Sequence, residues 1–280
     1  MHDRPYRSAL YIPASKERAL DKARDLPVDV ILFDLEDAVA PDAKVVARST
    51  LATALGAGGY GPRLTVVRMN ALDTVWGADD AAAIALMDCD AVLLPKVNGP
   101  ADLDALAALI PDKPFWAMIE TPMGVLNAAS IAAHPRMAGF VLGTNDLAKD
   151  LNSRSRVALM TALQMSVLAA KAAGIVVLDG VYNAFKDDEG LAAECAEGRD
   201  MGFDGKTLIH PAQVAICNAA FGPTDAELEL ANRQITAFDA AEADGQGVAV
   251  VDGKIVENLH IVTAKATLAK AAAIAALEAS

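Results

Sequence analysis

The sequence predicts an α/β fold, a (β/α)8 TIM barrel with a C-terminal helix-hairpin-helix lid. Short apolar runs recur eight times, segments with helical apolar spacing separate them, and most runs end in a charged or amide residue. Because each crossover helix must carry the chain back across the sheet, this alternation implies parallel strands. Eight units favour a closed barrel, and an open doubly wound sheet is the alternative.

The eight apolar runs are the expected strands. They cover residues 8–13, 30–37, 64–70, 91–97, 114–120, 139–147, 175–181 and 204–210. Residues 91–94 are all apolar, which is typical of a strand buried on both faces. Residues 157–173 have the apolar spacing of the intervening helices. Since catalytic residues of such barrels lie at the carboxyl ends of the strands, the polar run ends are candidate site residues.

One glycine-rich string, residues 56–61, matches the dinucleotide-binding pattern G-x-G-x-x-G. That motif binds a cofactor where it follows a strand and opens a helix. Here it follows a helical segment and precedes Pro62 and a strand. We therefore expect a helix-to-strand loop and no NAD site.

The barrel pattern stops near Gly222. We expect residues 1–222 to form the catalytic barrel domain and residues 223–280 to form a lid or an oligomerisation segment. The expected elements of this segment are a helix opened by the capping box Thr224 to Glu227, a hairpin with Asp252-Gly253 at its turn, and an Ala-rich helix over about residues 259–277.

Composition excludes several classes of protein. The chain is 54% hydrophobic, but no uninterrupted apolar stretch reaches the roughly 20 residues of a bilayer crossing. A net charge of −13 argues against nucleic-acid or anionic-membrane partners. The charged N-terminus resembles no targeting peptide, and three widely spaced cysteines suit a reducing compartment. We expect a cytoplasmic protein.

A local basic cluster contrasts with this acidic composition. The first 24 residues contain six of the 24 Lys and Arg. In a helix over residues 16–25, Arg18 and Lys22 would share one face. This face is either a solvated surface or a polyphosphate-binding edge.

Two carboxylates are candidate metal ligands. Glu120 ends the fifth run and Asp146 lies near the end of the sixth, so both would lie at one rim on adjacent strands. Two such carboxylates can hold Mg2+ while water and substrate oxygens complete the octahedron.

A denser acidic cluster, Asp34-Leu-Glu36-Asp37, ends the second run. So many carboxylates at the end of a buried strand require partners. Arg68, from the third run, would either pair with them as a structural ion pair or bind a substrate carboxylate.

In order and spacing, the motifs resemble the citrate lyase beta-chain (HpcH/HpaI aldolase) family of acyl-CoA lyases and thioesterases, over essentially the whole chain. The matching motifs are Leu10-Tyr-Ile-Pro13, Asp34-Leu-Glu-Asp37, Val67-Arg-Met-Asn70, Leu94-Pro-Lys-Val97, Ile119-Glu-Thr121, Gly143-Thr-Asn-Asp146, Met201-Gly-Phe-Asp-Gly-Lys206 and Ile209-His-Pro211. The resemblance is strongest to the bacterial members that hydrolyse (3S)-malyl-CoA.

The resemblance implies a homo-oligomer, a trimer or hexamer, in which the lid completes a neighbour's active site. It implies Mg2+ on Glu120 and Asp146, with Mn2+ as the alternative ion, and places Arg68 on the substrate carboxylate or thioester carbonyl. For CoA it implies contacts from Tyr11, Arg18, Lys22, Leu178 and Asp179.

One departure from the family concerns the lid. The family's lyases carry an Asp in the pattern G-x-[MLI]-[IV]-D, whereas Gly253-Lys-Ile-Val-Glu257 carries a Glu. A carboxylate displaced by about 1 Å can cost about a hundredfold in rate. The resemblance therefore implies Mg2+-dependent hydrolysis of (3S)-malyl-CoA to (S)-malate and CoA, with Glu257 as general base and Arg68, Glu36 and Asp37 as further catalytic residues.

Two alternatives remain. One is carbon-carbon cleavage of malyl-CoA, beta-methylmalyl-CoA or citramalyl-CoA to acetyl- or propionyl-CoA and a 2-oxo acid. The other is a citrate lyase beta subunit that acts on an acyl carrier protein.

Overall fold

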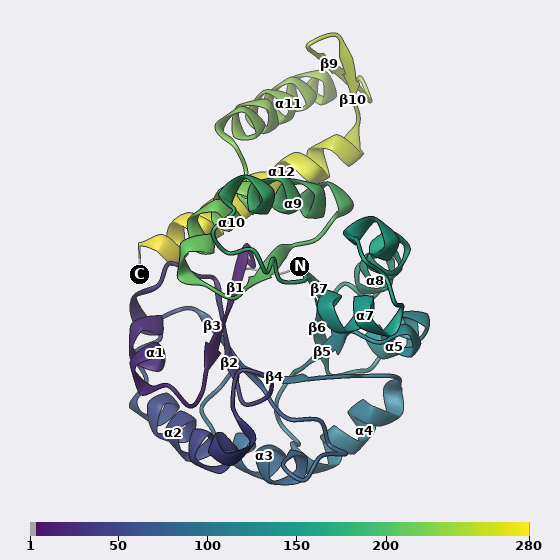
Figure 1. Ribbon diagram of the computed structural model, residues 1–280. Coiled ribbons are helices and arrows are strands. Elements are labelled where there is room, and N and C mark those ends of the chain that lie inside the picture. The colour runs from purple at the N-terminus through teal and green to yellow at the C-terminus, as the bar shows by residue number, and fades with distance from the viewer. Residues whose placement is uncertain (1–3, 280) are drawn as a thin grey trace. The chain divides into compact units, whose positions relative to one another are not determined.

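The structure, a computed structural model, describes residues 4–279 and contains a closed barrel of eight parallel strands (Figure 1). The strands are β1 (Ser8–Pro13), β2 (Val30–Asp34), β3 (Leu64–Arg68), β4 (Ala91–Leu94), β5 (Phe115–Ile119), β6 (Met137–Leu142), β7 (Val176–Asp179) and β8 (Gly205–Leu208). Each strand pairs with the next along the chain, and β8 closes the barrel on β1. The predicted TIM barrel is confirmed, and the open sheet is excluded.

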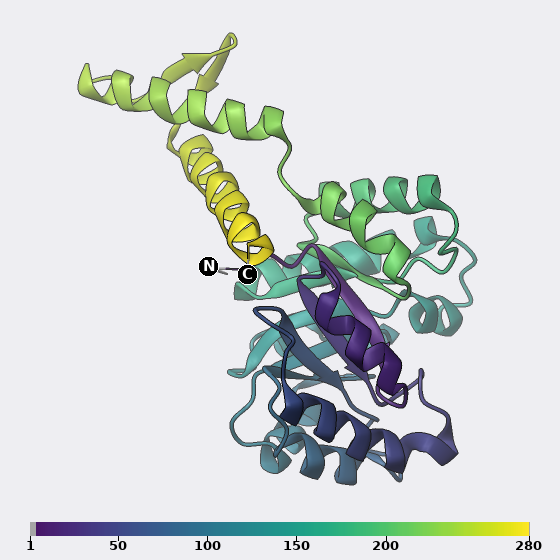
Figure 2. The ribbon, with the colours of Figure 1, turned by 90° about the vertical axis from the view of Figure 1, so that its left-hand side faces the viewer.

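Helices surround the barrel, as Figures 1 and 2 show from two directions. The α-helices are α1 (Glu17–Lys22), α2 (Lys44–Ala57), α3 (Gly77–Ile84), α4 (Pro100–Leu109), α5 (Pro122–Leu126), α6 (Ala128–Ala132), α7 (Thr144–Asp150), α8 (Met160–Ala173), α9 (Asp188–Met201) and α10 (Val214–Phe221). Short 3-10 turns are η1 (Ala23–Asp25), η2 (Pro41–Ala43), η3 (Arg156–Leu159) and η4 (Pro211–Gln213). The glycine string, residues 56–61, covers the last two residues of α2 and the start of the loop 58–63 that connects α2 to β3, as predicted for a helix-to-strand connection.

Side chains fill the inside of the barrel. Because successive strand residues point to opposite faces, one set packs inside the barrel and the other packs against the helices. Trp116 is the largest interior side chain, and its ring centroid lies 6.0 Å from that of Tyr6. Gly139 makes room for it, since a Cβ there would lie 2.8 Å from the indole. Met118 of β5 and Glu120, which directly follows β5, belong to the same interior-facing set and lie nearer the carboxyl ends of the strands.

All strands except β1 end earlier than the predicted runs, and the sixth differs most. The run at residues 139–147 divides at Gly143: β6 ends at Leu142, and α7 begins at Thr144. Placing Asp146 at a strand end was therefore wrong, because it lies in the first turn of α7. The polar residues Thr144 to Asp146 favour the start of a helix over a buried strand.

A second compact unit is formed by residues 4–5 and 222–279. It contains α11 (Asp225–Ala243), the hairpin β9 (Ala249–Val251) and β10 (Lys254–Val256), and α12 (Asn258–Glu278). The predicted capping box opens α11, since the Glu227 N–H donates to Thr224 Oγ1 at 3.2 Å. Asp252 and Gly253 form the predicted turn with φ values of 50° and 74°. The helix-hairpin-helix prediction is confirmed.

Helix α12 is relevant to the expectation that the chain contains no membrane-spanning segment. Among residues 4–279 it is the one helix long and apolar enough, by length and composition, to cross a bilayer, and it is mostly exposed. Much of its apolar content is Ala, and Lys265 and Lys270 interrupt it. Because these lysines interrupt the apolar run, the search for an uninterrupted apolar stretch did not identify this helix. One such helix is weak evidence for a membrane.

Candidate active site

A cavity of about 310 Å³ opens at the carboxyl ends of the barrel strands. Five charged residues line it: Asp34, Asp37, Glu120, Asp146 and Arg68. The structure thus brings together the acidic cluster, the arginine and the two candidate metal ligands. Four carboxyl groups facing one guanidinium make the cavity attractive to a cation.

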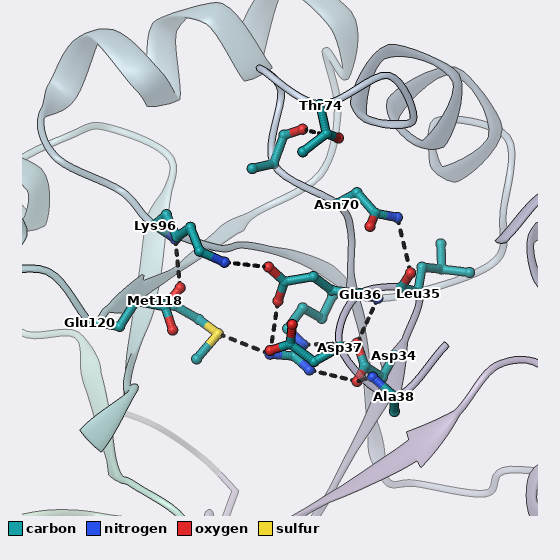
Figure 3. A network of polar contacts seen from close by, with 12 residues as sticks. Asp34, Leu35, Glu36, Asp37, Ala38, Asn70, Thr74, Lys96, Met118 and Glu120 are labelled. Carbon is teal, nitrogen blue, oxygen red and sulfur yellow. Dashed lines mark hydrogen bonds and ion pairs between the residues drawn. The ribbon is translucent and has the colours of Figure 1, made fainter. Parts of the chain in front are cut away.

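Arg68 is held by a bidentate ion pair. Its Nε and Nη2 donate to Asp34 Oδ1 and Oδ2 at 2.8 and 2.5 Å, and both side chains are buried. Asp34 also accepts from the backbone N–H groups of Glu36 and Ala38, at 2.8 and 3.1 Å (Figure 3). Of the two roles expected for Arg68, the ion pair is present, and the guanidinium still lines the cavity.

The rest of the acidic cluster surrounds the other amino group of Arg68. Nη1 lies 2.9 Å from Glu36 Oε2 and 3.3 Å from Asp37 Oδ2. Lys96 Nζ lies 2.8 Å from the second oxygen of Glu36, Oε1 (Figure 3). Burial raises the pKa of Glu36, although both cations oppose this effect.

Tyr11 covers the guanidinium from one side. The Arg68 carbon Cζ lies 4.7 Å from the centroid of the Tyr11 ring, within the range of a cation–π contact. Burial raises the pKa of Tyr11 well above its usual value, so the phenol is neutral at physiological pH. Tyr11 lines the cavity, as expected of a substrate contact.

Glu120 is almost fully buried at the base of the cavity, with 2% of its surface exposed. Its Oε1 accepts a hydrogen bond of 2.8 Å from the backbone N–H of Lys96 (Figure 3). Burial and then the charge of Glu36 raise its pKa to about 7, although Lys96 opposes the shift. Gly143 is needed here, because a Cβ at that position would lie 2.4 Å from Oε2.

Glu120 and Asp146 fit a divalent cation. No hydrogen bond from residues 4–279 reaches Glu120 Oε2 or the Asp146 carboxylate, and both residues line the cavity. The two carboxylates also interact electrostatically, since the charge of Asp146 raises the pKa of Glu120. The described residues contain no group of three or more His, Cys, Asp or Glu that could hold a metal. Two carboxylates completed by water and substrate oxygens suit Mg2+, which keeps several waters.

The expected CoA contacts are dispersed. Arg18 and Lys22 are exposed on α1, whereas Leu178 is buried in the barrel interior. Neither Leu178 nor Asp179 lines the cavity.

The Asp179 carboxylate is fully buried in an ion-pair cluster. It lies 2.9 Å from both Arg156 Nη2 and Lys206 Nζ, and Glu194 of α9 joins the cluster through Lys206. The Asp179 side chain therefore does not line this cavity, and the expected contact of Asp179 with CoA stays a prediction. Strand alternation directs it away from the barrel interior that the neighbouring Leu178 enters.

Glu257 belongs to the second unit, where it links β10 to α12. Its side chain is exposed, and its backbone N–H donates to His260 Nδ1 at 3.0 Å.

Sequence reasoning missed Lys44, which orders the acidic loop. This buried lysine donates from Nζ to the carbonyl oxygens of Leu35 and Glu36, at 3.0 and 2.9 Å, and lies 5.0 Å from the Trp76 ring centroid. It also assigned no site role to Asn145 or Asn183, which line the cavity. Both follow barrel strands, a position that could have identified them.

Comparison with known proteins identifies relatives over nearly the whole chain. Residues 7–211 match the family described as HpcH/HpaI aldolase/citrate lyase, and residues 154–275 match the C-C bond lyases of the TIM-barrel fold. The (3S)-malyl-CoA thioesterase of Cereibacter sphaeroides is 64% identical, covering 99% of this chain and 98% of its own. The citrate lyase subunit beta of Escherichia coli K12 is 34% identical, covering 96% and 94%.

A solved structure resembles the chain over a similar length. It is protein CitE from Mycobacterium tuberculosis in complex with magnesium, acetoacetate and coenzyme A. Its TM-score is 0.81 at 30% identity, and the match covers 96% of this chain and 98% of that one.

Proposed function

Because the chain belongs to the HpcH/HpaI aldolase/citrate lyase family, we propose that it hydrolyses (3S)-malyl-CoA to (S)-malate and CoA with Mg2+ as its cofactor. The observation that carries the proposal is the cavity, in which Glu120 Oε2 and the Asp146 carboxylate accept no hydrogen bond from residues 4–279 and share the lining with the fixed guanidinium of Arg68. The nearly full-length similarity to malyl-CoA thioesterases supports the substrate. Water supplies the oxygen of the new carboxyl group, and CoA leaves as the thiol.

Glu120 and Asp146 would hold the cation. When bound, Mg2+ supplies Lewis-acid stabilisation to the carboxylate and hydroxyl oxygens of the malyl group. Mn2+ would satisfy the same oxygen ligands. The magnesium in the CitE complex supports this assignment.

Arg68 would stabilise negative charge on the thioester oxygen. Its bidentate pair with Asp34 fixes the plane of the guanidinium, so little reorganisation is required as charge develops. Glu36 and Asp37 contact Arg68, so we assign them the role of positioning it. Tyr11 excludes water from one face of the guanidinium.

Glu257 would act as the general base that takes a proton from the attacking water. Its exposed carboxylate lies in the unit formed largely by the expected lid, residues 223–280. We propose that this segment completes the site of a neighbouring subunit in a trimer or hexamer. CoA would bind beside Tyr11, with its phosphates near Arg18 and Lys22 of α1.

We also propose a cytoplasmic location. The three cysteines, Cys89, Cys195 and Cys217, are free and buried, as suits a reducing compartment.

A second candidate is carbon-carbon cleavage, which would yield glyoxylate and acetyl-CoA from malyl-CoA. The match of residues 154–275 to C-C bond lyases favours it. The Glu at position 257, where the family's lyases carry Asp, favours hydrolysis.

The test is to incubate the protein with (3S)-malyl-CoA and Mg2+ and to measure free thiol and glyoxylate together. Thiol without glyoxylate supports hydrolysis, whereas glyoxylate without thiol overturns it in favour of the lyase. Glu120→Ala should abolish either reaction. Glu257→Gln should lower kcat, while Glu242→Gln, an exposed carboxylate of α11, is the matched control.

A further inference from the structure

Asn145 and Asn183 form a reciprocal amide pair on the cavity wall. Asn145 lies in the first turn of α7, and Asn183 lies in the loop after β7. Asn183 Nδ2 donates to Asn145 Oδ1 at 2.8 Å, and Asn145 Nδ2 donates to Asn183 Oδ1 at 3.3 Å. Two hydrogen bonds between planar groups hold both amides in one orientation.

The pair still has hydrogen-bonding capacity. Each amide has two N–H donors and an oxygen with two lone pairs, and the pair uses one of each. Within residues 4–279 no other hydrogen bond reaches either amide, and both side chains are exposed at the cavity. One N–H of each amide is therefore available to a ligand.

Other side-chain nitrogen donors of the cavity are largely occupied. Arg68 is the one cation that lines it among the described residues, and its Nε, Nη1 and Nη2 all contact carboxylates. The hydroxyl of Thr207, which also lines the cavity, donates to the Asp179 carbonyl at 3.0 Å. With Arg68 assigned to the thioester oxygen, the two amides are the side-chain nitrogen donors that remain for the far end of the acyl group.

We propose that the Asn145–Asn183 pair binds the free carboxylate of the acyl group and makes the enzyme select acyl thioesters that end in a carboxylate. The inference rests on the proposed function and names its specificity-determining residues. Neutral amides suit this role, because each can donate a hydrogen bond to the substrate carboxylate without adding a positive charge. A positive charge here would be neutralised by the carboxylates of the cavity. Asn183 is the better probe, since Asn145 adjoins the proposed ligand Asp146.

The experiment compares kcat/KM for (3S)-malyl-CoA and for 3-hydroxybutyryl-CoA, in which a methyl group replaces the carboxylate. Asn183→Leu, of similar size, should reduce the ratio of kcat/KM for malyl-CoA to kcat/KM for 3-hydroxybutyryl-CoA about tenfold. The reduction should come from a lower kcat/KM for malyl-CoA, as expected for a lost hydrogen bond to a charged group. Asn183→Asp should reduce it further by repulsion. Asn127→Leu is the matched control, a half-buried amide outside the cavity that donates to Asn98 O at 2.7 Å.

A second readout separates this inference from the proposed function. The dissociation constant of (S)-malate, measured by calorimetry with Mg2+ present, should rise about tenfold in Asn183→Leu and stay unchanged in Asn127→Leu. If the wild-type protein releases no thiol from malyl-CoA, the hydrolysis proposal fails, and malate binding still tests the pair. If Asn183→Leu keeps both the wild-type substrate ratio and the wild-type malate affinity, the pair has no role in selection.

Discussion

Replacing Gly143 by Ala should disable the cavity without unfolding the barrel. The backbone there has φ −92° and ψ 73°, so alanine adds no left-handed strain. Its Cβ would lie 2.3 Å from Glu120 Cβ and 2.4 Å from Glu120 Oε2. Ordinary contact begins near 3.4 Å, and the Cβ of Glu120 moves only with its main chain, so the backbone at Glu120 or at residue 143 must shift by about 1 Å and displace the carboxylate.

The displacement sets the expected magnitudes. A misplacement near 1 Å can cost about a hundredfold in rate, so kcat/KM of Gly143→Ala should fall by about that factor. Overpacking a filled site costs about 1–3 kcal/mol in the free energy of unfolding, which leaves the protein folded. Mg2+ affinity should fall at least about tenfold, because metal sites tolerate little change in ligand position.

The assays are calorimetric Mg2+ titration, steady-state thiol release and urea unfolding. Gly99→Ala is the matched control, since a Cβ there would meet only Asn127 Nδ2, at 3.9 Å. Wild-type Mg2+ affinity and activity in a folded Gly143→Ala protein would refute the argument that Gly143 makes space for Glu120.

Four further predictions follow from burial, charge and packing. Because the pKa of Glu120 is about 7, protons should compete with Mg2+ for its carboxylate. The association constant of Mg2+ should rise about tenfold per pH unit from pH 5 to 7 and then level off. A calorimetric association constant that does not change with pH would contradict this. In the metal-free protein the same shift should lower the free energy of unfolding as the pH rises from about 4.5 to 7, since the folded state binds the proton more tightly. Asp179→Asn should cost about 3–5 kcal/mol in the free energy of unfolding, because Arg156 and Lys206 would lose the charge of their buried partner. KM for the acyl-CoA should stay constant, and a raised KM in the folded variant would instead support the predicted contact of Asp179 with CoA. Gly56→Ala should raise the free energy of unfolding by about 0.5–1 kcal/mol in urea titrations, because residue 56 lies in α2 and an alanine Cβ there would meet no atom within 4 Å. An unchanged free energy of unfolding would count against open space at this position.

Much of the barrel rim could be predicted because its signals are local. A strand buried on both faces shows as an apolar run, and a parallel barrel places all carboxyl ends at one rim. Arg68, Glu120 and the acidic cluster were therefore placed at one end of the barrel before their contacts were known. The element that contains Asp146 was mistaken, since the predicted run was extended past Gly143 into Thr144 to Asp146, whose polar side chains favour the start of a helix.

The direction and the partners of each side chain depended on the tertiary structure. Leu178 and Asp179 are neighbours in sequence, yet one enters the barrel interior and the other an ion-pair cluster with Arg156. The Asn145–Asn183 pair joins two loops that lie 38 residues apart.

The sequence by itself determined the order of strands and helices, the helix-hairpin-helix that follows, and the chemical types at the rim. It did so because periodicity, capping and turn preferences act between residues a few positions apart. Only the tertiary structure decided that Asp34 holds Arg68 and that Glu120 keeps one oxygen without a hydrogen bond. It also decided that the pKa of Glu120 rises to about 7. Desolvation and Coulomb interactions depend on distance through space, which distant parts of the chain set together.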